Sequence, residues 1–524
     1  MVFLHTAVSD ASRKDSVLPS GAHDPRLDAE TTQELKEILT EAPAGVAEKV
    51  AGTAQSTSYR TQDRFLSSTV YGTRWAQQDI PRFEMPENEM PPGECIDADE
   101  LALDGNPVLN LASFVTTYME EEAEKLMAQN MSKNFIDYEE YPQTAEIQAR
   151  CVNMIARLFN CPVDSPSQET VGCSTIGSSE AIILCTLAMK RRWQEARRAK
   201  GLDASKPNLV MGANVQVCWE KAVKYLEIEP RYVYCTDTVY TMIPENAVEL
   251  CDENTIGVAA ILGSTYTGHY EDVKTLNKLL IEKNKELGTD IGIHVDAASG
   301  GFVAPFVDPE LEWDFRLERV ISINVSGHKY GLTYAGVGWA VWRSAHYLPD
   351  DLVFHINYLG SDQASFTLNF SKGAANVIAQ YYVLIRLGRS GFASIMNNLT
   401  CTSDYLAGCL EKTGRFTILS ETGGKGLPLV AWKLKEKHHY DELLRVVVRE
   451  DFSRARCEML IKDILMVVKQ LDKQDKKAIE TSRNDRRAKQ HWAALRHVNK
   501  AFGIGAKLKK EEDKVSAIKT TGVC

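Results

Sequence analysis

The sequence lacks the features that mark several large classes of protein. Its twelve cysteines include no Cys-x-x-Cys pair, which argues against a zinc site, and no Gly-x-Gly-x-x-Gly follows a predicted strand. No run approaches the roughly eighteen apolar residues of a membrane span. The net charge of −11 lacks the positive sign that a nucleic-acid binder needs. We therefore expect a cytoplasmic protein without a membrane span, a nucleic-acid partner or a disulfide framework.

The composition is that of an ordinary globular protein. Of the 524 residues, 44% are hydrophobic and 25% are charged. A chain of this length has room for more than one domain. Composition and breaker residues predict a flexible arm at 1–60, a connector at 61–115, a large domain at 116–387, a small domain at 388–475 and a basic tail at 476–524.

Strand-like runs alternate with helical patterns in the predicted large domain. The candidate helices are 178–199, 219–226 and 273–287. The candidate strands are 208–211, 231–235, 257–263, 291–295 and 321–325. This alternation predicts an α/β fold with a mainly parallel sheet, whose ligand lies at the carboxyl ends of the strands.

Lys329 lies between two short apolar runs, at 320–325 and 336–342. Both runs read as strands, which places the lysine on the turn between them. An isolated lysine in such a turn is usually a solvated surface residue. If it instead faces a cleft shielded from bulk water, its amine can attack carbonyl groups.

Asp296 ends another predicted buried strand and favours the second interpretation of Lys329. Small residues follow it, ending in Gly300 and Gly301, and they allow a bulky group to approach the backbone. A buried carboxylate must be paired, and a protonated pyridine nitrogen would pair it. His294 lies on the same face of the strand, but a third ligand at suitable spacing is absent, so we discount a metal pair.

Gly177, Ser178 and Ser179 open the helix predicted at 178–199. Free backbone N–H groups, two hydroxyls and the positive end of the helix dipole would form a phosphate cradle there. An ordinary capped helix start is the commoner interpretation of an isolated Gly-Ser-Ser. The presence of Lys329 and Asp296 in the same chain favours the phosphate.

Two long motifs carry a family resemblance. The segment His-Val-Asp-Ala-Ala-Ser-Gly-Gly-Phe at 294–302 and Ser-Gly-His-Lys-Tyr-Gly at 326–331 resemble the pyridoxal-phosphate decarboxylases of the group that contains glutamate decarboxylase. The likeness runs from about Leu103 to the region of Cys457. It implies the aspartate-aminotransferase-like fold (fold type I), with a smaller α/β C-terminal domain and pyridoxal 5'-phosphate as the cofactor.

The implied reaction is the α-decarboxylation of L-glutamate to 4-aminobutanoate and CO2. Lys329 would hold the cofactor, Asp296 would keep its ring nitrogen protonated, and His328 or Lys329 would supply the proton that replaces the carboxylate. A related decarboxylase or carbon–carbon lyase with another substrate, and a catalytically impaired variant, remain the alternatives. The expected cofactor contacts are Ser178, Ser179, Gln216, Thr265, Asp296, Ser326, His328, Lys329 and Ser371.

The resemblance also assigns substrate contacts and a subunit interface. Ser113, Phe114 and Asp137 match positions that hold the distal carboxylate in bacterial relatives, although those have threonine where this chain has Ser113. Arg449 is matched to the arginine that meets a substrate carboxylate. Ser371 is expected to reach the phosphate of a neighbouring subunit, which implies a homo-oligomer. If the substrate's distal carboxylate lies beside the carboxylate of Asp137, one of the two groups must be protonated. We therefore expect activity to favour mildly acid pH.

The sequence departs from the family pattern near 436–444. The family has a further helix and strand there, whereas this chain passes directly into the apolar run 443–448. A skipped exon, a faulty gene model and a real compact variant remain the possible causes. The shorter domain predicts exposed apolar surface and an unpaired sheet edge.

The C-terminal tail is basic and amphipathic. Residues 483–510 contain nine Lys and Arg against one Asp, with Trp492, Leu495, Val498 and Phe502 at helical spacing. A solvated tail is the preferred interpretation. A calmodulin-binding helix is the alternative, because plant members of the family carry one.

Overall fold

A computed structural model describes residues 83–87, 101, 103–356, 363–435 and 443–472. The chain divides into two compact units after Gly105, and all the strands described below belong to the second unit. The predicted arm at 1–60, the shortened segment 436–442 and the amphipathic tail at 483–510 lie outside the described residues. Within the described part of the chain, every helix is too short or too polar to cross a membrane.

A seven-stranded sheet forms the centre of the second unit, with the strand order β1-β7-β6-β5-β4-β2-β3. Its strands are β1 (Val171–Thr175), β2 (Asn208–Gly212), β3 (Glu229–Val233), β4 (Thr255–Ile261), β5 (Gly292–Asp296), β6 (Val320–Ser326) and β7 (Gly338–Trp342). Strands β2 to β6 pair in parallel, which confirms the predicted mainly parallel sheet. Strand β7 runs antiparallel to both neighbours, because the short connection from β6 contains no crossover helix.

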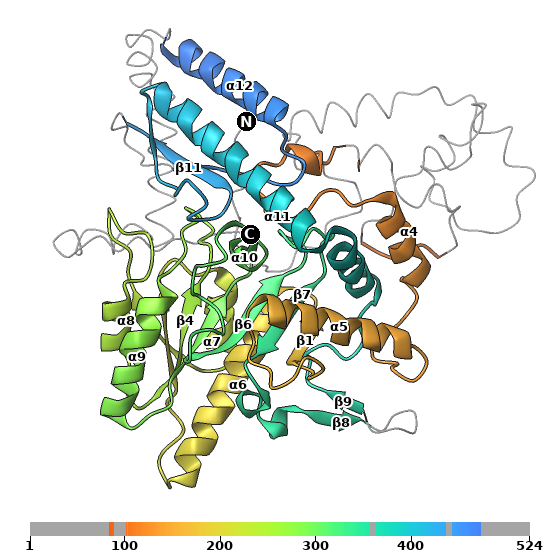
Figure 1. Cartoon of the computed structure of the whole chain (residues 1–524), viewed down its shortest axis with the longest axis vertical. Coiled ribbons are helices and arrows are strands. Elements are labelled where there is room, and N and C mark those ends of the chain that lie inside the picture. The colour runs from red at the N-terminus through yellow and green to blue at the C-terminus, as the bar shows by residue number, and fades with distance from the viewer. Residues whose placement is uncertain (1–82, 88–100, 102, 357–362, 436–442, 473–524) are drawn as a thin grey trace, which may run out of the picture. The chain divides into compact units, whose positions relative to one another are not determined.

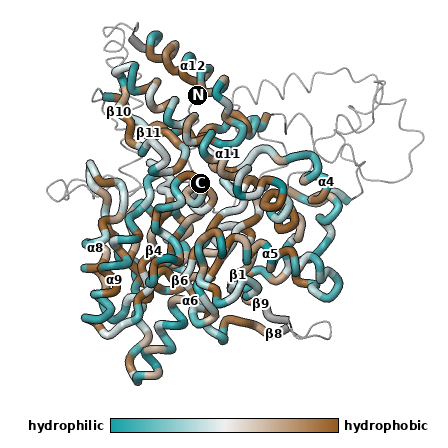
Figure 2. Tube along the Cα trace, viewed as in Figure 1, coloured by the Kyte–Doolittle hydropathy of each residue, from teal (hydrophilic) through white to brown (hydrophobic). Residues whose placement is uncertain are grey.

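Helices cover both faces of this sheet (Figure 1). One face packs against α6 (Ser178–Ala199) and α7 (Val217–Tyr225). The other packs against α5 (Pro142–Leu158), α9 (Val273–Leu287), α10 (Ala304–Val307) and the first half of α11 (Ala375–Lys412). Successive strand residues face opposite layers, since Val258 contacts the second group and Ala259 the first. Figure 2 shows the resulting hydrophobic colouring along β4 and β6.

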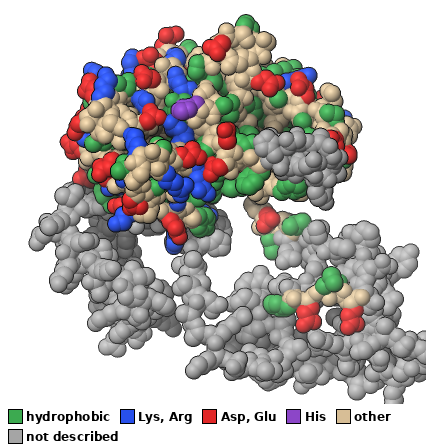
Figure 3. Space-filling model, turned by 90° about the horizontal axis from the view of Figure 1, so that it is seen from below, with side chains coloured by type: hydrophobic (Ala, Val, Ile, Leu, Met, Phe, Trp, Pro, Cys, Tyr) green, Lys and Arg blue, Asp and Glu red, His purple; other side chains and the backbone are tan. Residues whose placement is uncertain are grey.

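The remaining described elements are short, apart from α4. They are η3 (Pro107–Leu109), α4 (Glu121–Asn130), α8 (Pro244–Glu249), η4 (Gly300–Phe302), η5 (Ala345–Tyr347), η6 (Asp350–Leu352) and a hairpin of β8 (Phe354–Ile356) and β9 (Gln363–Ser365). On the face drawn in Figure 3, acidic and basic side chains of the described residues lie interspersed, so that this face carries no basic footprint.

A smaller sheet follows the large one. Its strands are β10 (Phe416–Ile418), β11 (Leu429–Leu434) and β12 (Leu444–Val447). The second half of α11 packs against this sheet, and α12 (Arg454–Asp472) packs against α11. Helix α11 therefore packs against both sheets. Gly388 interrupts it with a φ of 57° and a ψ of −174°, at the position where we placed the start of the small domain. Both sheets lie in one compact unit, so the domain boundaries stay a prediction.

The shortened region has the predicted effect on the surface but a different effect on the sheet edge. Leu434, Leu443 and Leu444 are 41%, 39% and 41% exposed around the join between β11 and β12. The edge of β12 is partly paired, however, because the backbone N–H of Val447 donates to the carbonyl of Leu111 at 2.8 Å. The chain around Leu111 thus covers the edge that we expected to be open.

Candidate active site

Lys329 lies on the turn between β6 and β7, at the carboxyl edge of the parallel strands. Its amine is half-buried and donates to the hydroxyl of Ser299 at 3.2 Å. The turn is held from outside, because Thr116 donates its hydroxyl to the carbonyl of Lys329 at 2.8 Å and its N–H to the carbonyl of His328 at 3.0 Å. The amine is therefore fixed in position and faces a hollow.

The empty space of that hollow, which includes its opening to solvent, is about 280 Å3. Its lining consists of Asn214, Gln216, Ile261, Gly263, Thr265, Asp296, Ala298, Ser299 and Lys329. These residues follow β2, β4, β5 and β6, so the cavity is built where parallel strands end, as the alternation pattern predicted. Gln216 and Thr265 hydrogen-bond to each other across its wall.

Asp296 is 5% exposed and faces the cavity from the end of β5. One carboxylate oxygen accepts from the indole N–H of Trp219 at 2.9 Å. The other accepts from the side-chain amide of Asn324 at 3.0 Å and from the N–H of Ala298 at 3.1 Å. Three donors thus bond to this carboxylate, which has room for a fourth. Asp296 can therefore accept a proton-bearing ring nitrogen.

The N-terminus of α6 forms the other end of the site. No side chain caps this helix, so its first N–H groups remain available, and the hydroxyl of Ser178 bonds to that of Ser326. Nearby, Nδ1 of His328 is buried without a hydrogen-bond partner. Burial and then the charge of Lys329 lower the pKa of His328 to about 4. An anion placed here would supply the missing partner.

These residues fit pyridoxal phosphate. Its phosphate matches the uncapped helix start and the orphaned imidazole nitrogen, its aldehyde matches the amine of Lys329, and its ring nitrogen matches Asp296. A metal pair at His294 does not fit, because both ring nitrogens are bonded within the protein, to Ser322 at 2.8 Å and to Asn324 at 2.7 Å.

Phe114 and Arg445 lie beside the cavity. The ring of Phe114 is buried, with the Lys329 amine 5.5 Å and the Arg445 guanidinium 5.0 Å from its centroid. Arg445 also donates to the carbonyl of Thr265 and, at 2.6 Å, to that of Ala112. A cation from β12 of the small sheet thus lies near Lys329.

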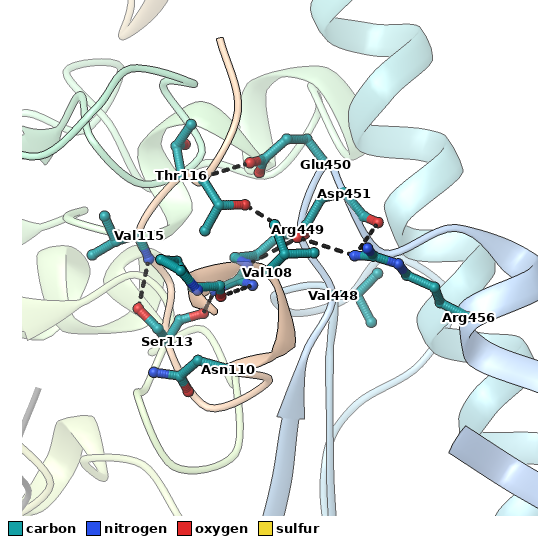
Figure 4. A network of polar contacts seen from close by, with 12 residues as sticks. Val108, Asn110, Ser113, Val115, Thr116, Val448, Arg449, Glu450, Asp451 and Arg456 are labelled. Atoms are coloured by element: carbon teal, nitrogen blue, oxygen red, sulfur yellow. Dashed lines mark hydrogen bonds and ion pairs between the residues drawn. The ribbon is translucent and has the colours of Figure 1, made fainter. Parts of the chain in front are cut away.

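Arg449 differs from its expected role. It is 2% exposed and donates to the carbonyls of Ser113 at 3.1 Å and Pro107 at 3.2 Å, and it pairs with Asp451 at 3.4 Å (Figure 4). These bonds occupy its guanidinium in the joint between the small sheet and residues 107–117. The contacts support a structural role for Arg449, and they place Arg445 where a substrate carboxylate could be met.

The other expected substrate contacts divide between two places. Ser113 precedes Phe114 near the cavity, and its hydroxyl accepts from the N–H of Val115 at 3.1 Å. Asp137 and Ser371 lie on segments that pair with each other, since Asn134 donates to the hydroxyl of Ser371 at 3.3 Å. Neither Asp137 nor Ser371 belongs to the described lining of the cavity of Lys329.

Sequence reasoning missed several residues that hold the site. Thr116, Trp219, Ser299 and Asn324 bond directly to Lys329 or Asp296. Asn324 could have been found from the sequence, because a polar residue inside an otherwise apolar strand needs a partner. Sequence reasoning did not single out Arg445, which lies on β12, whereas Arg449 lies two residues beyond the end of that strand.

A lysine and an aspartate at the carboxyl edge of a mainly parallel, doubly covered sheet define a pyridoxal-phosphate enzyme of fold type I. The pyridoxal-dependent decarboxylase conserved domain matches residues 86–435. The chain belongs to this family of decarboxylases.

Individual relatives agree with that assignment. Glutamate decarboxylase of Petunia hybrida is 54% identical over 433 residues, which is 77% of this chain and 86% of the relative, and glutamate decarboxylase 1 of Arabidopsis thaliana has the same values. The solved glutamate decarboxylase of Lactobacillus brevis has a TM-score of 0.71 at 40% identity, over 76% of this chain and 97% of that one.

Proposed function

We propose that this protein removes the α-carboxylate of L-glutamate, giving 4-aminobutanoate and CO2 with pyridoxal phosphate as cofactor. The observation that carries the proposal is the single cavity lined by both Lys329 and Asp296. The identity of the substrate is supported by the relatives, several of which are glutamate decarboxylases at 52–54% identity.

Each residue of the site has a part in this reaction. Bound pyridoxal phosphate supplies an electron sink for the electrons left on Cα when CO2 departs. Asp296 keeps a proton on the ring nitrogen, and the start of α6, with Ser178, anchors the phosphate. Arg445 offers a charged fork to a substrate carboxylate. The amine of Lys329 is positioned to return a proton to Cα.

Replacing Lys329 by alanine tests the proposal. Purified wild-type protein, supplied with pyridoxal phosphate, should release CO2 from L-glutamate faster than from L-aspartate, L-tyrosine or L-tryptophan, and Lys329→Ala should release none. Lys125→Ala is the control, because Lys125 lies exposed on α4. A wild type that is inactive on all four substrates, or one that prefers an aromatic substrate, would refute the assignment.

We also propose a homo-oligomer in which the segments of Asp137 and Ser371 complete the site of a neighbouring subunit. Exposed Ile176 and Leu368 support this, because the backbone N–H groups of both bond to Glu180 in the first turn of α6, and apolar side chains exposed together at a site favour a covering partner. Mixing inactive Lys329→Ala with inactive Asp137→Ala should recover about a quarter of wild-type activity, since half of randomly formed dimers have one intact site. No recovery in mixtures shown to exchange subunits would contradict it.

Two further proposals concern the cell. The ten cysteines that the structure describes have free thiols, which supports a cytoplasmic location.

The basic tail at 483–510 is proposed as a calmodulin target, on its charge and apolar spacing alone. Full-length protein should then bind calmodulin with calcium and not with a chelator, and a chain ending at 479 should not bind. Equal binding by both chains would refute the tail as the target.

A further inference from the structure

Three polar side chains form a buried line behind Asp296. Strands β5 and β6 pair so that His294 faces Ser322 and Asp296 faces Asn324 across the ladder. His294, Ser322 and Asn324 are fully buried, and their side chains bond in sequence, from Ser322 to His294 at 2.8 Å, to Asn324 at 2.7 Å and to Asp296 at 3.0 Å. The chemistry proposed above uses only Asp296.

If Asp296 is ionised, its charge determines which atom carries each proton along this line. An ionised carboxylate only accepts, so Asn324 must turn its NH2 towards Asp296 and its carbonyl towards His294. That carbonyl also only accepts, so His294 must carry its proton on Nε2. Its Nδ1 then accepts from the hydroxyl of Ser322. Burial lowers the pKa of His294, which agrees with a neutral ring.

We infer that Ser322, His294 and Asn324, together with Trp219 on the opposite oxygen, are positioning residues that keep Asp296 ionised and aimed at the ring nitrogen of the cofactor. The inference rests on the proposed use of pyridoxal phosphate. Trp219 reaches the opposite oxygen of Asp296 from α7, and its ring also lies edge-on to that of His294, with the centroids 5.4 Å apart. Because the indole donates to its own oxygen of Asp296, its loss should have an effect of its own, while members of the line should act through one another.

A cofactor analogue isolates the contact with the ring nitrogen. In 1-deazapyridoxal phosphate a C–H replaces that nitrogen, while the aldehyde, hydroxyl, methyl and phosphate groups keep their positions on the ring. The measured quantity is the ratio of the dissociation constants of the analogue and of pyridoxal phosphate, obtained by titrating apoenzyme. Wild type should prefer the natural cofactor. Asn324→Ala should lower that preference about tenfold, because one donor to a charged acceptor is lost.

The other variants complete the test. Ser322→Ala should lower the ratio less than Asn324→Ala, and adding His294→Phe to Asn324→Ala should change it no further, whereas Trp219→Phe should add its own effect. Thr186→Val is the control, because Thr186 is fully buried on α6 and its hydroxyl has no partner. Ser322→Ala removes only one oxygen, so it serves if the larger changes prevent folding.

The outcomes separate this inference from the proposed function. If Asn324→Ala and Ser322→Ala weaken both cofactors equally, the ratio stays at the wild-type value and the line has only a structural role. If wild type itself fails to distinguish the two cofactors, Asp296 does not bind the ring nitrogen. If wild type binds neither cofactor, the proposed use of pyridoxal phosphate is refuted, and the inference that rests on it is refuted with it.

Discussion

Arg445 and Arg449 lie four residues apart at the edge of the small sheet, and their guanidinium groups meet different partners. Arg445 lies over Phe114 beside the cavity, while Arg449 is buried among the carbonyls of Ser113 and Pro107. The first arrangement leaves a cation next to Lys329. The second uses its donors to join the small sheet to residues 107–117.

Exchanging each arginine for glutamine should separate these roles. Arg445→Gln should lower kcat/KM for L-glutamate about a hundredfold, because a hydrogen-bonded charge opposite a carboxylate is lost, with little change in melting temperature. Arg449→Gln should lower the free energy of unfolding by about 3 kcal/mol, since the buried guanidinium's hydrogen bonds to two carbonyls and its ion pair with Asp451 are lost. Steady-state kinetics and thermal unfolding of both variants measure this. Equal kinetic losses in two stable variants would contradict it.

Glu271 is a buried carboxyl group that the reaction does not use. It accepts from the N–H groups of Ile261 at 2.8 Å and Met242 at 3.1 Å and from Asn214 at 3.3 Å. Burial raises its pKa to about 7. It thus fastens the end of β4 to the loop that leads to Gln216.

The pH dependence of stability should reveal this group. The unfolded chain releases the Glu271 proton near pH 4.5 and the native chain only near 7, so the native state binds more protons between those values. Stability therefore falls as pH rises through that window, by about 3 kcal/mol for this group. Denaturant unfolding from pH 4 to 8 should show a smaller fall for Glu271→Gln. Glu286→Gln, an exposed change, should follow the wild type.

At the scale of elements, the start of α6 depends on how closely β7 approaches it. A Cβ on Gly338 would lie 2.7 Å from the carbonyl carbon of Gly177 and 2.8 Å from the hydroxyl of Thr175. Only glycine permits this approach. Strand β7 therefore sets the position of the N–H groups that are proposed to bind phosphate.

Gly338→Ala should raise the dissociation constant for pyridoxal phosphate about tenfold, because the added methyl group displaces the helix start. Fluorescence titration of apoenzyme measures it. Gly408→Ala is the matched control, since nothing lies within 4 Å of its added Cβ in α11, and there alanine should raise the free energy of unfolding by about 0.5–1 kcal/mol. An unchanged dissociation constant in Gly338→Ala would separate β7 from phosphate binding.

Elements with strong local signals were predictable from sequence. Helix α9 has the predicted bounds, because Asp272 caps its start and Gly288 ends it in the left-handed conformation. Helix α11 instead continues past Gly388, where we placed the start of the small domain. The direction of β7 and the covering of β12 by Leu111 depend on long-range pairing, which local sequence does not encode.

At the scale of the whole molecule, the part of the candidate site that could be predicted from sequence was the set of residues with reactive or polar side chains. Lys329, Asp296, Gln216 and Thr265 line one cavity as expected. The residues that hold them, such as Thr116 and Trp219, come from distant segments with no shared motif. Only the folded structure shows which of Arg445 and Arg449 lies beside the cavity. The answer depends on which guanidinium lies against the ring of Phe114 and which bonds to the backbone of the preceding residue.

The exposed leucines at the shortened join should affect association of whole molecules. Leu434→Lys with Leu443→Lys should reduce light scattering on heating, because charge at a sheet edge opposes edge-to-edge pairing, and should leave kcat/KM unchanged. Leu202→Lys, at an isolated exposed leucine, should have no such effect. Scattering that is unchanged in the double variant would mean that this join does not mediate aggregation.

The break in α11 at Gly388 is a point at which the two halves of the helix can turn relative to each other. The first half of the helix is fastened to the lysine turn, where Gln380 donates to the carbonyl of Gly331 at 3.0 Å, and the second half supports the strands that hold Arg445. One φ/ψ pair at Gly388, of positive φ, fixes the angle between the two halves. A swing of Arg445 towards or away from Lys329 along this helix would therefore turn on Gly388, which has no side chain to resist it.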